Sequence, residues 1–344
     1  MTKAKRGELG VCVVAAGEIG QVYLRSWTQA EDIRIVSVAD IDAERAEKAA
    51  EEYAAPACET DYKKAIDQEG VDIVTVCTPT MLHPEVSIYA AERGKHVLCV
   101  KPIALTLADA NRMIEAAEQN DVSLCVGFMR RYTPTTKDVI EAVQDGTMRR
   151  PALYRVEMGN RIRPKILMHD QHGNGGPLID MCCHYIDIAR VYFASDPAKV
   201  FARGMVLAKG RQELEAIKDL AIDTASVVVT YESGDILTMN VCWGLPPNHG
   251  GAANEVILAP GGSIEGLGFA PTELCIHTDT KKQTITWEKD QAVQRSFDLL
   301  VDDFVRCIRS GRPASVTGAD GVKALEVSLA ALESIETGRV VDVG

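Results

Sequence analysis

Short apolar runs alternate with amphipathic stretches over the first 128 residues. The pattern predicts strands at 9–15, 33–39, 71–77, 96–100 and 124–127, and helices at 19–30, 43–53, 84–93 and 107–120. Strands separated by helices of this length pair in parallel through right-handed crossovers. This part of the chain therefore predicts a doubly wound parallel α/β sheet of the Rossmann type.

The pattern of apolar and polar positions changes after residue 128. The pattern predicts helices at 135–145, 178–193, 292–310 and 319–337, and strands at 152–158, 200–207, 224–231, 236–242, 254–259, 274–277 and 284–288. Most of these strands follow one another without a crossover helix, which favours antiparallel pairing. We therefore predict two domains: residues 1–128, and an α/β domain with a mostly antiparallel open sheet over residues 129–344.

The amino-acid composition of the chain argues against several classes of protein. The net charge of −12 argues against nucleic acid and anionic membranes as partners, because both require a basic surface. No apolar run approaches the roughly 20 residues of a membrane span, and the apolar start resembles a first buried strand more than a signal peptide. Most of the ten cysteines lie in apolar runs, and no CxxC occurs. These features predict a soluble protein of the cytoplasm.

The first predicted strand ends in a glycine-containing turn, VCVVAAGEIG. The dinucleotide fingerprint GxGxxG falls on Ala15, Gly17 and Gly20, so its first glycine is alanine. A glycine in the middle lets the backbone approach a pyrophosphate, and the following helix offers free N–H groups. Alanine at the first position is compatible only if its dihedral angles are not left-handed. The residues of this turn expected to contact the cofactor are Ala16, Gly17, Glu18 and Ile19.

An acidic residue, Asp40, ends the second predicted strand about 20 residues after the turn. A carboxylate there accepts hydrogen bonds from the adenosine ribose and repels a 2′-phosphate. Ile41 offers no partner for such a phosphate, so the sequence favours NAD over NADP. The alternative is that Asp40 caps the next helix.

Three further segments lie where strands of a parallel sheet end, on the edge that binds ligands. Thr78 and Pro79 follow the third strand, and His83 begins the next helix either as a cofactor contact or as a cap. Lys101 follows the fourth strand and precedes Pro102. The alternative for Lys101 is an ordinary surface lysine.

A second constellation lies in GGPLIDMCCHYID, residues 175–187. Asp180 and His184 are four apart on the predicted helix and so share a face, and Asp187 is near that face. A lone helical histidine is usually structural. The preceding loop holds many groups suited to binding hydroxyls: Arg161, Arg163, Lys165, His169, Asp170, His172 and Asn174. The alternatives are a solvated loop or, with no third ligand evident, a metal site at His169 and His172.

Together these motifs resemble the glucose–fructose oxidoreductase / inositol dehydrogenase (Gfo/Idh/MocA) family. The resemblance covers nearly the whole chain through VVAAGEIG, VCTPTMLHP, GKHVLCVKP, GFMRRYTP, GGPLIDMCCH and the tail GRPASVTGADGVKALEVSLAALESIETGRVVDV. It implies an NAD-binding Rossmann domain, then an α/β domain whose open sheet commonly forms the interface of a homo-oligomer, a dimer or tetramer. It also implies hydride transfer to or from a ring carbon of a sugar or cyclitol.

The resemblance assigns roles to residues. Lys101, Asp180 and His184 form the implied catalytic group: His184 as general base, Lys101 on the reacting oxygen, and Asp180 orienting the substrate or His184. Arg130 or Arg131 lies toward the nicotinamide, and Arg130 is taken as a cofactor contact. The expected substrate contacts are Lys101, Asp180 and His184, which the resemblance implies, and Arg161, Arg163 and His169, which belong to the polar loop.

Three departures from the family pattern stand out: Val100 replaces the glutamate before Lys101, Cys182 replaces a common glycine, and Ala15 replaces the first fingerprint glycine. Two other functions stay open. One is a redox-assisted glycosidase in which NAD stays bound, and the other is a non-catalytic, nucleotide-sensing regulator on the same fold.

Overall fold

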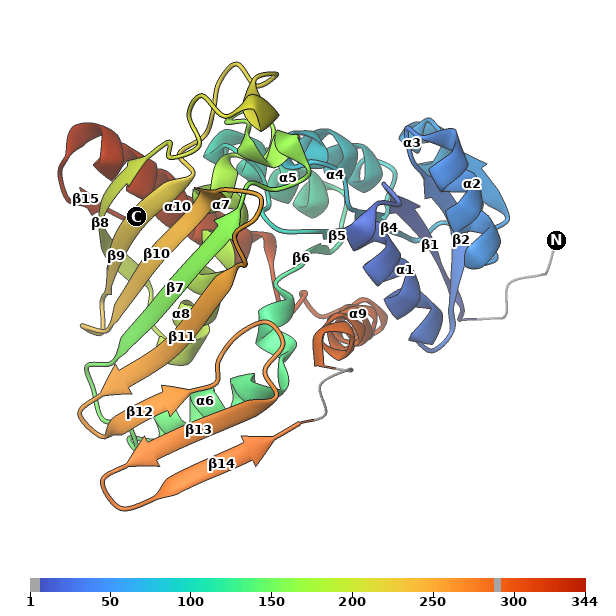
Figure 1. Cartoon of the computed structure of the whole chain (residues 1–344). Coiled ribbons are helices and arrows are strands. Elements are labelled where there is room, and N and C mark those ends of the chain that lie inside the picture. Colours follow the sequence, from blue (N-terminus) through green and yellow to red (C-terminus); the bar gives the residue numbers. More distant parts are fainter. Residues whose placement is uncertain (1–6, 288–291) are drawn as a thin grey trace. The chain divides into compact units, whose positions relative to one another are not determined.

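The computed structural model describes residues 7–287 and 292–344 (Figure 1). By its internal contacts the chain divides into two compact units. The first unit holds residues 1–129 and 294–322, and the second holds residues 130–293 and 323–344. Within the described residues, no helix is both long enough and apolar enough to cross a membrane.

The first unit is built on a six-stranded sheet with the order β3-β2-β1-β4-β5-β6. Its strands, all parallel, are β1 (Leu9–Val14), β2 (Ile33–Ala39), β3 (Ala57–Glu59), β4 (Ile73–Val76), β5 (His96–Cys99) and β6 (Leu124–Val126). Strand order reverses between β1 and β4, and ligands of such sheets bind outside the carboxyl ends at this point. The predicted doubly wound sheet is confirmed.

Helices connect these strands close to their predicted positions. They are α1 (Glu18–Gln29), α2 (Ala43–Glu52), α3 (Tyr62–Ile66), the short turn η1 (Thr80–Leu82), α4 (His83–Ala91), α5 (Leu107–Gln119) and most of α9 (Ala292–Ser310). The sequence pattern missed β3 and α3, because elements of three and five residues are too short to show a period. Helix α9 packs on α1, where Ser26 Oγ donates to Asp298 Oδ1 over 2.8 Å.

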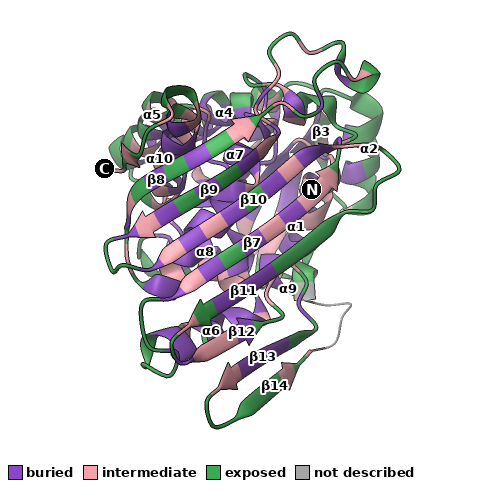
Figure 2. Ribbon diagram, turned by 60° about the vertical axis from the view of Figure 1, so that its left-hand side comes forward, coloured by how far each residue is buried: buried purple, intermediate pink, exposed green. Residues whose placement is uncertain are grey.

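The second unit is built on a nine-stranded sheet with the order β14-β13-β12-β11-β7-β10-β9-β8-β15 (Figure 2). Its strands are β7 (Leu153–Arg161), β8 (Pro197–Met205), β9 (Thr224–Tyr231), β10 (Ile236–Leu245), β11 (Ala252–Ala259), β12 (Gly262–Glu265), β13 (Glu273–Thr278), β14 (Lys282–Thr286) and β15 (Val341–Asp342). Only β7 and β10 pair in parallel, so the prediction of a mostly antiparallel sheet is confirmed. The short β12 and β15 were not predicted, and the predicted end of the last strand at residue 288 lies outside the described residues.

Helices pack against one face of this sheet. They are α6 (Pro134–Gln144), α7 (Gly176–Asp180), α8 (Cys182–Phe193) and most of α10 (Gly318–Thr337), with short turns η2 (Met129–Tyr132), η3 (Ile166–His169) and η4 (Gln212–Leu214). Both α7 and α8 contact β10, whose buried residues recur at every second position: Leu237, Met239, Val241 and Trp243. This alternation is what a sheet with one covered face requires.

The single helix predicted over 178–193 is wrong. The segment forms two helices that meet at Met181, with Asp180 ending α7 and His184 lying in α8. The thiol of Cys183 donates to the Asp180 carbonyl over 3.3 Å, and the His184 amide donates to the Met181 carbonyl, three residues back. The regular four-residue hydrogen bond between Asp180 and His184 is therefore replaced by a three-residue one.

Candidate active site

The turn between β1 and α1 has the features of a phosphate cradle. Gly17 is the N-cap of α1 and makes no side-chain cap, so the helix N-terminus keeps its N–H groups for a ligand. A Cβ added at Gly17 would meet nothing within 4 Å, which leaves the backbone open to close approach. A Cβ on Gly20 would lie 2.1 Å from the carbonyl oxygen of Ala15, so only glycine fits there. The turn fits the pyrophosphate of a dinucleotide.

Ala15 corrects a prediction. Its φ is +72°, in the left-handed region that the sequence argument had excluded for an alanine. The Ala15 amide still donates to the Ala39 carbonyl over 2.7 Å, so the ladder with β2 extends to this residue before the chain turns sharply. The left-handed conformation costs a non-glycine residue on the order of 1 kcal/mol. The geometry of the turn therefore determines the conformation of Ala15, although alanine by itself disfavours a left-handed φ.

Asp40 lies at the end of β2 and is nearly buried, at 5% exposure. Its carboxylate accepts hydrogen bonds from the Ala16 amide at 2.8 Å and the Asp42 amide at 3.0 Å, which joins the glycine turn to the end of β2. The N-cap of α2 is Asp42, so the interpretation of Asp40 as that cap is wrong. The Arg45 guanidinium forms an ion pair with Asp40 at 3.1 Å. Sequence reasoning missed Arg45, although its position five residues after Asp40 was a usable signal.

The same edge of the first unit carries the residues after β4 and β5. The His83 ring is buried, with Nδ1 2.8 Å from the Pro102 carbonyl and Nε2 2.9 Å from the Thr78 carbonyl. His83 therefore ties the loop after β4, which includes Pro79, to the loop after β5, which includes Lys101. The N-cap of α4 is Leu82, so His83 is not that cap.

In the second unit, Asp180 and His184 lie where α7 meets α8, and both are nearly buried, at 4% and 6% exposure. The His184 ring packs edge to face against Phe269, with centroids 4.9 Å apart. Phe269 lies in the loop between β12 and β13 and was not singled out by the sequence, because that loop carries no motif.

The arginines after β6 are held by acids of the second unit. Arg130 is 2% exposed and its Nη2 donates to Glu255 Oε2 over 2.6 Å. Burial opposes the charged form, yet the Glu255 carboxylate keeps the pKa of Arg130 above its usual value. Arg131 makes a two-pronged ion pair with the buried Asp187, at 2.9 Å and 2.5 Å. This pairing gives Asp187 a structural role, and Glu255 was not foreseen.

The polar loop before α7 is partly ordered by its own side chains. Asp170 Oδ1 accepts from the amides of His172 and Gly173, so it organises the turn. His169 is buried, at 1% exposure, and its Nε2 accepts from the Arg163 amide over 2.9 Å. Arg161 is exposed and donates to the Pro247 carbonyl. Across residues 7–287 and 292–344, no three side chains are grouped as metal ligands.

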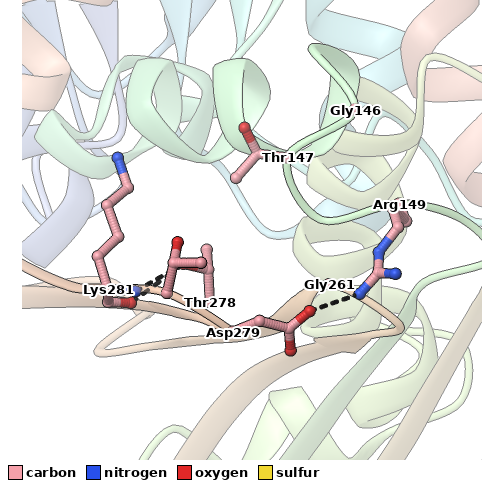
Figure 3. Close-up of a pocket in the computed structure, with 8 residues that line it drawn as sticks. Gly146, Thr147, Arg149, Gly261, Thr278, Asp279 and Lys281 are labelled. Carbon is pink, nitrogen blue, oxygen red and sulfur yellow. Dashed lines mark hydrogen bonds and ion pairs between the residues drawn. The ribbon is translucent and has the colours of Figure 1, made fainter.

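A separate pocket of about 290 Å³ lies on the second unit (Figure 3). Its lining residues are Gly146, Thr147, Arg149, Gly261, Thr278, Asp279, Thr280 and Lys281. Arg149 is paired with Asp279 at 3.0 Å, and no predicted site residue lines the pocket. It holds neither a general base nor a dinucleotide turn, so we place no chemistry there.

Comparison with known proteins agrees with this geometry. Residues 9–128 match the family described as "Oxidoreductase family, NAD-binding Rossmann fold", and residues 140–343 match "Oxidoreductase family, C-terminal alpha/beta domain". The chain is 29% identical to myo-inositol 2-dehydrogenase of Thermotoga maritima, covering 96% of this chain and 97% of that protein. It is 26% identical to scyllo-inositol 2-dehydrogenase (NAD(+)) of Bacillus subtilis, covering 96% and 95%.

Solved structures show the same fold. A probable dehydrogenase from Thermotoga maritima superposes with a TM-score of 0.79 at 28% identity, covering 97% of this chain and 98% of that one. Levoglucosan dehydrogenase in complex with NADH gives 0.86 at 20% identity, covering 98% and 99%. The two family matches together span most of the chain, and they confirm the resemblance carried by its motifs. The chain belongs to the Gfo/Idh/MocA family of NAD-binding oxidoreductases.

Proposed function

We propose that this oxidoreductase moves a hydride between NAD and a ring carbon of a sugar or cyclitol, as an NAD-dependent dehydrogenase. The glycine turn, the open N-terminus of α1 and Asp40 fit the pyrophosphate and adenosine ribose of the cofactor. Relatives along the whole chain are named as dehydrogenases of myo-inositol and scyllo-inositol, which are cyclic polyols. We favour NAD over NADP because of the carboxylate of Asp40.

The observation that carries the proposal is the burial of two ionisable side chains, Asp180 and His184, where α7 meets α8. Burying an ionisable group lowers stability unless the group is paired or hydrogen-bonded, and ionisable groups in such surroundings concentrate at catalytic sites. Their positions also match the family motif GGPLIDMCCH. We therefore assign the proton chemistry to this junction.

Oxidation of the alcohol breaks two bonds. NAD, held by the glycine turn and Asp40, would supply the acceptor for the hydride, which leaves the carbon with its electron pair. His184 takes the hydroxyl proton, for which an imidazole suits because its usual pKa lies near neutrality. Lys101 stabilises the charge that develops on the reacting oxygen, and Asp180 orients the substrate or His184. The ketone forms when the carbon has lost the hydride and His184 has taken the hydroxyl proton.

Val100 stands where the family pattern has a glutamate, and its side chain is buried, at 7% exposure. The residue before Lys101 is therefore apolar in this chain.

The test is NADH formation with a panel of inositols, aldoses and anhydrosugars. His184→Ala should lower kcat by roughly 10²–10⁴-fold and keep NAD binding, while His249→Ala, at an exposed histidine, serves as the matched control. Lys101→Ala should lose about 3–4 kcal/mol of transition-state stabilisation, and Lys101→Arg should restore little of it. Near-normal turnover by His184→Ala would show that the base is elsewhere.

The same measurement separates the alternatives. Stoichiometric release of NADH identifies a dehydrogenase. Cleavage of a glycoside without net NADH identifies the redox-assisted glycosidase. NAD binding with no cofactor reduction by any polyol identifies a nucleotide-sensing regulator and would overturn the proposed function.

A further inference from the structure

Ala16, in the glycine turn, is held by side chains on both sides of its Cα. Its amide N–H donates to Asp40 Oδ2 over 2.8 Å, and its carbonyl oxygen accepts from Gln21 Nε2 over 3.2 Å. The N–H and the carbonyl belong to the two different peptide planes that flank the Ala16 Cα, so both planes are fixed. Gln21 therefore holds the turn as directly as Asp40 does, although no sequence motif singles it out.

Gln21 lies in the first turn of α1 and is half-buried. Side chains of a helix lean toward its N-terminus, so the side chain of Gln21 reaches back to the turn that precedes the helix. The backbone amide of Gln21 donates at the same time to the Gly17 carbonyl over 2.9 Å. One residue thus binds two successive carbonyl groups of the turn, those of Ala16 and Gly17.

The partners of Gln21 decide which way its side-chain amide is turned. A carbonyl oxygen only accepts hydrogen bonds, so Nε2 must face Ala16 and Oε1 must face away from it. There Oε1 accepts from the hydroxyl of Tyr53, the C-cap of α2, over 3.0 Å. Burial, and after it the Glu52 carboxylate, raise the pKa of Tyr53, so the hydroxyl keeps the proton that it donates. Tyr53 therefore fixes Gln21, and Gln21 fixes the turn.

The peptide bond between Ala16 and Gly17 is trans, so its C=O and N–H point in opposite directions. Holding the Ala16 carbonyl toward Gln21 therefore turns the Gly17 N–H to the opposite side. Among the residues that the structure describes, none accepts a hydrogen bond from this N–H. A Cβ added at Gly17 would meet nothing within 4 Å, so the backbone is open at this point. The N–H is thus oriented and available to a ligand.

We propose that Gln21 is a positioning residue of the NAD site, which directs the Gly17 N–H at the pyrophosphate, and that Tyr53 holds Gln21 in this orientation. The middle glycine of a dinucleotide turn is where the backbone approaches the pyrophosphate. A peptide that is already oriented loses less freedom when the ligand binds, which increases affinity. Asp40 does not suffice, because it holds the peptide plane before Ala16 and not the one after it. The proposal concerns the cofactor and is independent of the proposed reaction.

The first experiment observes this peptide bond directly. Ala16–Gly17 is the only place in the chain where glycine follows alanine. Labelling alanine carbonyls with ¹³C and glycine nitrogens with ¹⁵N therefore gives a single HNCO cross-peak. In the cofactor-free protein, Gln21→Met should move the ¹³C resonance upfield, because the carbonyl loses a hydrogen bond. NADH should move the Gly17 proton downfield in the wild type and by less in the variant. A ¹³C resonance that does not move in Gln21→Met would overturn the proposal.

The second experiment measures the Kd for NADH, without turnover. Gln21→Met keeps the length of the side chain and removes its donor, so Kd should rise about 2- to 10-fold, the range for one neutral hydrogen bond. ADP-ribose, which contains the pyrophosphate, should lose affinity to the same extent, whereas adenosine at millimolar concentration should lose none. Gln29→Met, at an exposed glutamine at the end of α1, is the matched control. Equal losses for adenosine and ADP-ribose would show that Gln21 supports only the fold.

The third experiment tests the role of Tyr53. Tyr53→Phe removes the hydroxyl and keeps the ring, so the Kd for NADH should rise by less than in Gln21→Met. Tyr62→Phe removes a hydroxyl that binds Glu85 elsewhere in the first unit and should leave Kd unchanged. Because Tyr53 acts through Gln21, the double variant should bind NADH as Gln21→Met alone does. Additive losses would overturn the role of Tyr53. These measurements decide the proposal even if no polyol reduces the cofactor.

Discussion

The His184 imidazole meets the Phe269 ring edge to face, with centroids 4.9 Å apart and planes at 85°. Another neighbour of Phe269 is Arg130, whose guanidinium carbon lies 4.8 Å from the ring centroid. Arg130 is in turn paired with Glu255. The phenyl ring thus stands beside both the proposed base and a buried cation, and it positions the imidazole without taking part in proton transfer.

Replacing Phe269 should therefore change the chemical step more than cofactor binding. An aromatic pair of this kind contributes about 0.5–1.5 kcal/mol, so Phe269→Ala should lower kcat by up to roughly tenfold, with the Kd for NAD unchanged. Phe269→Tyr should restore kcat. A loss of NAD affinity equal to the loss of kcat would contradict a positioning role.

Arg45 should determine how the enzyme responds to loss of Asp40. Asp40→Ser removes the carboxylate that repels a 2′-phosphate and frees the Arg45 guanidinium to bind one. We expect kcat/KM with NADP to rise by at least about tenfold, and the double variant with Arg45→Met to lose that gain. Lys48→Met, one turn further along α2 and exposed, is the control. Equal NADP activity in the single and double variants would exclude a role for Arg45.

The left-handed conformation of Ala15 makes a stability prediction. Ala15→Gly relieves strain of about 1–2 kcal/mol, but glycine also raises the entropy of the unfolded chain by about 0.4–1 kcal/mol. The expected net gain is about 0.5–1 kcal/mol in the free energy of unfolding by urea. Ala16→Gly, without a positive φ, should lower that free energy. If both substitutions destabilise equally, Ala15 is not strained.

The uncovered face of the second sheet predicts self-association. Phe201 and Val228 are cross-strand partners on β8 and β9, and both are exposed, at 38% and 39%. Met205, further along β8, is 58% exposed. We propose that this face joins copies of the chain. Light scattering should show a dimer or tetramer at micromolar concentration and a smaller particle for Val228→Lys, whereas Gln119→Lys, on the first unit, should keep the wild-type size. A wild-type monomer would contradict the proposal.

Burial of His169 predicts how stability depends on pH. Its pKa lies below the usual 6.5 in the folded state, chiefly through burial. Above about pH 6.5 both states are neutral and the group contributes no pH dependence. As the pH falls below that value, the unfolded chain takes up the proton first, so the free energy of unfolding decreases. His169→Gln should show a smaller decrease between pH 7.5 and 5.5 in urea unfolding. An unchanged decrease would assign the dependence to other groups, among them His96, whose pKa burial also lowers.

Local pattern was sufficient for the long strands of the first unit and for the family. Each of these strands is a mostly apolar run, and each ligand-edge residue lies within three residues of the end of such a run: Gly17, Asp40, Thr78 and Lys101. Short-range order of this kind depends only on neighbours in the chain. The prediction failed first where elements were too short to show a period, as in β3, α3 and β12.

Two further features depended on tertiary structure. The pairing of Arg45 with Asp40 follows from the way α2 leaves the sheet. Phe269 reaches His184 from a loop without a motif.

The sequence by itself determined the fold class, the nucleotide turn and the identity of Asp180 and His184 as candidates, because these rest on local patterns. Only the tertiary structure decided which side chains from distant parts of the chain lie next to one another. Trp243 lies beside Arg163 and His169 because β10 pairs in parallel with β7, which places the carboxyl ends of both strands together. The register between strands is set by side chains far apart in the chain, and no periodicity along the sequence encodes it.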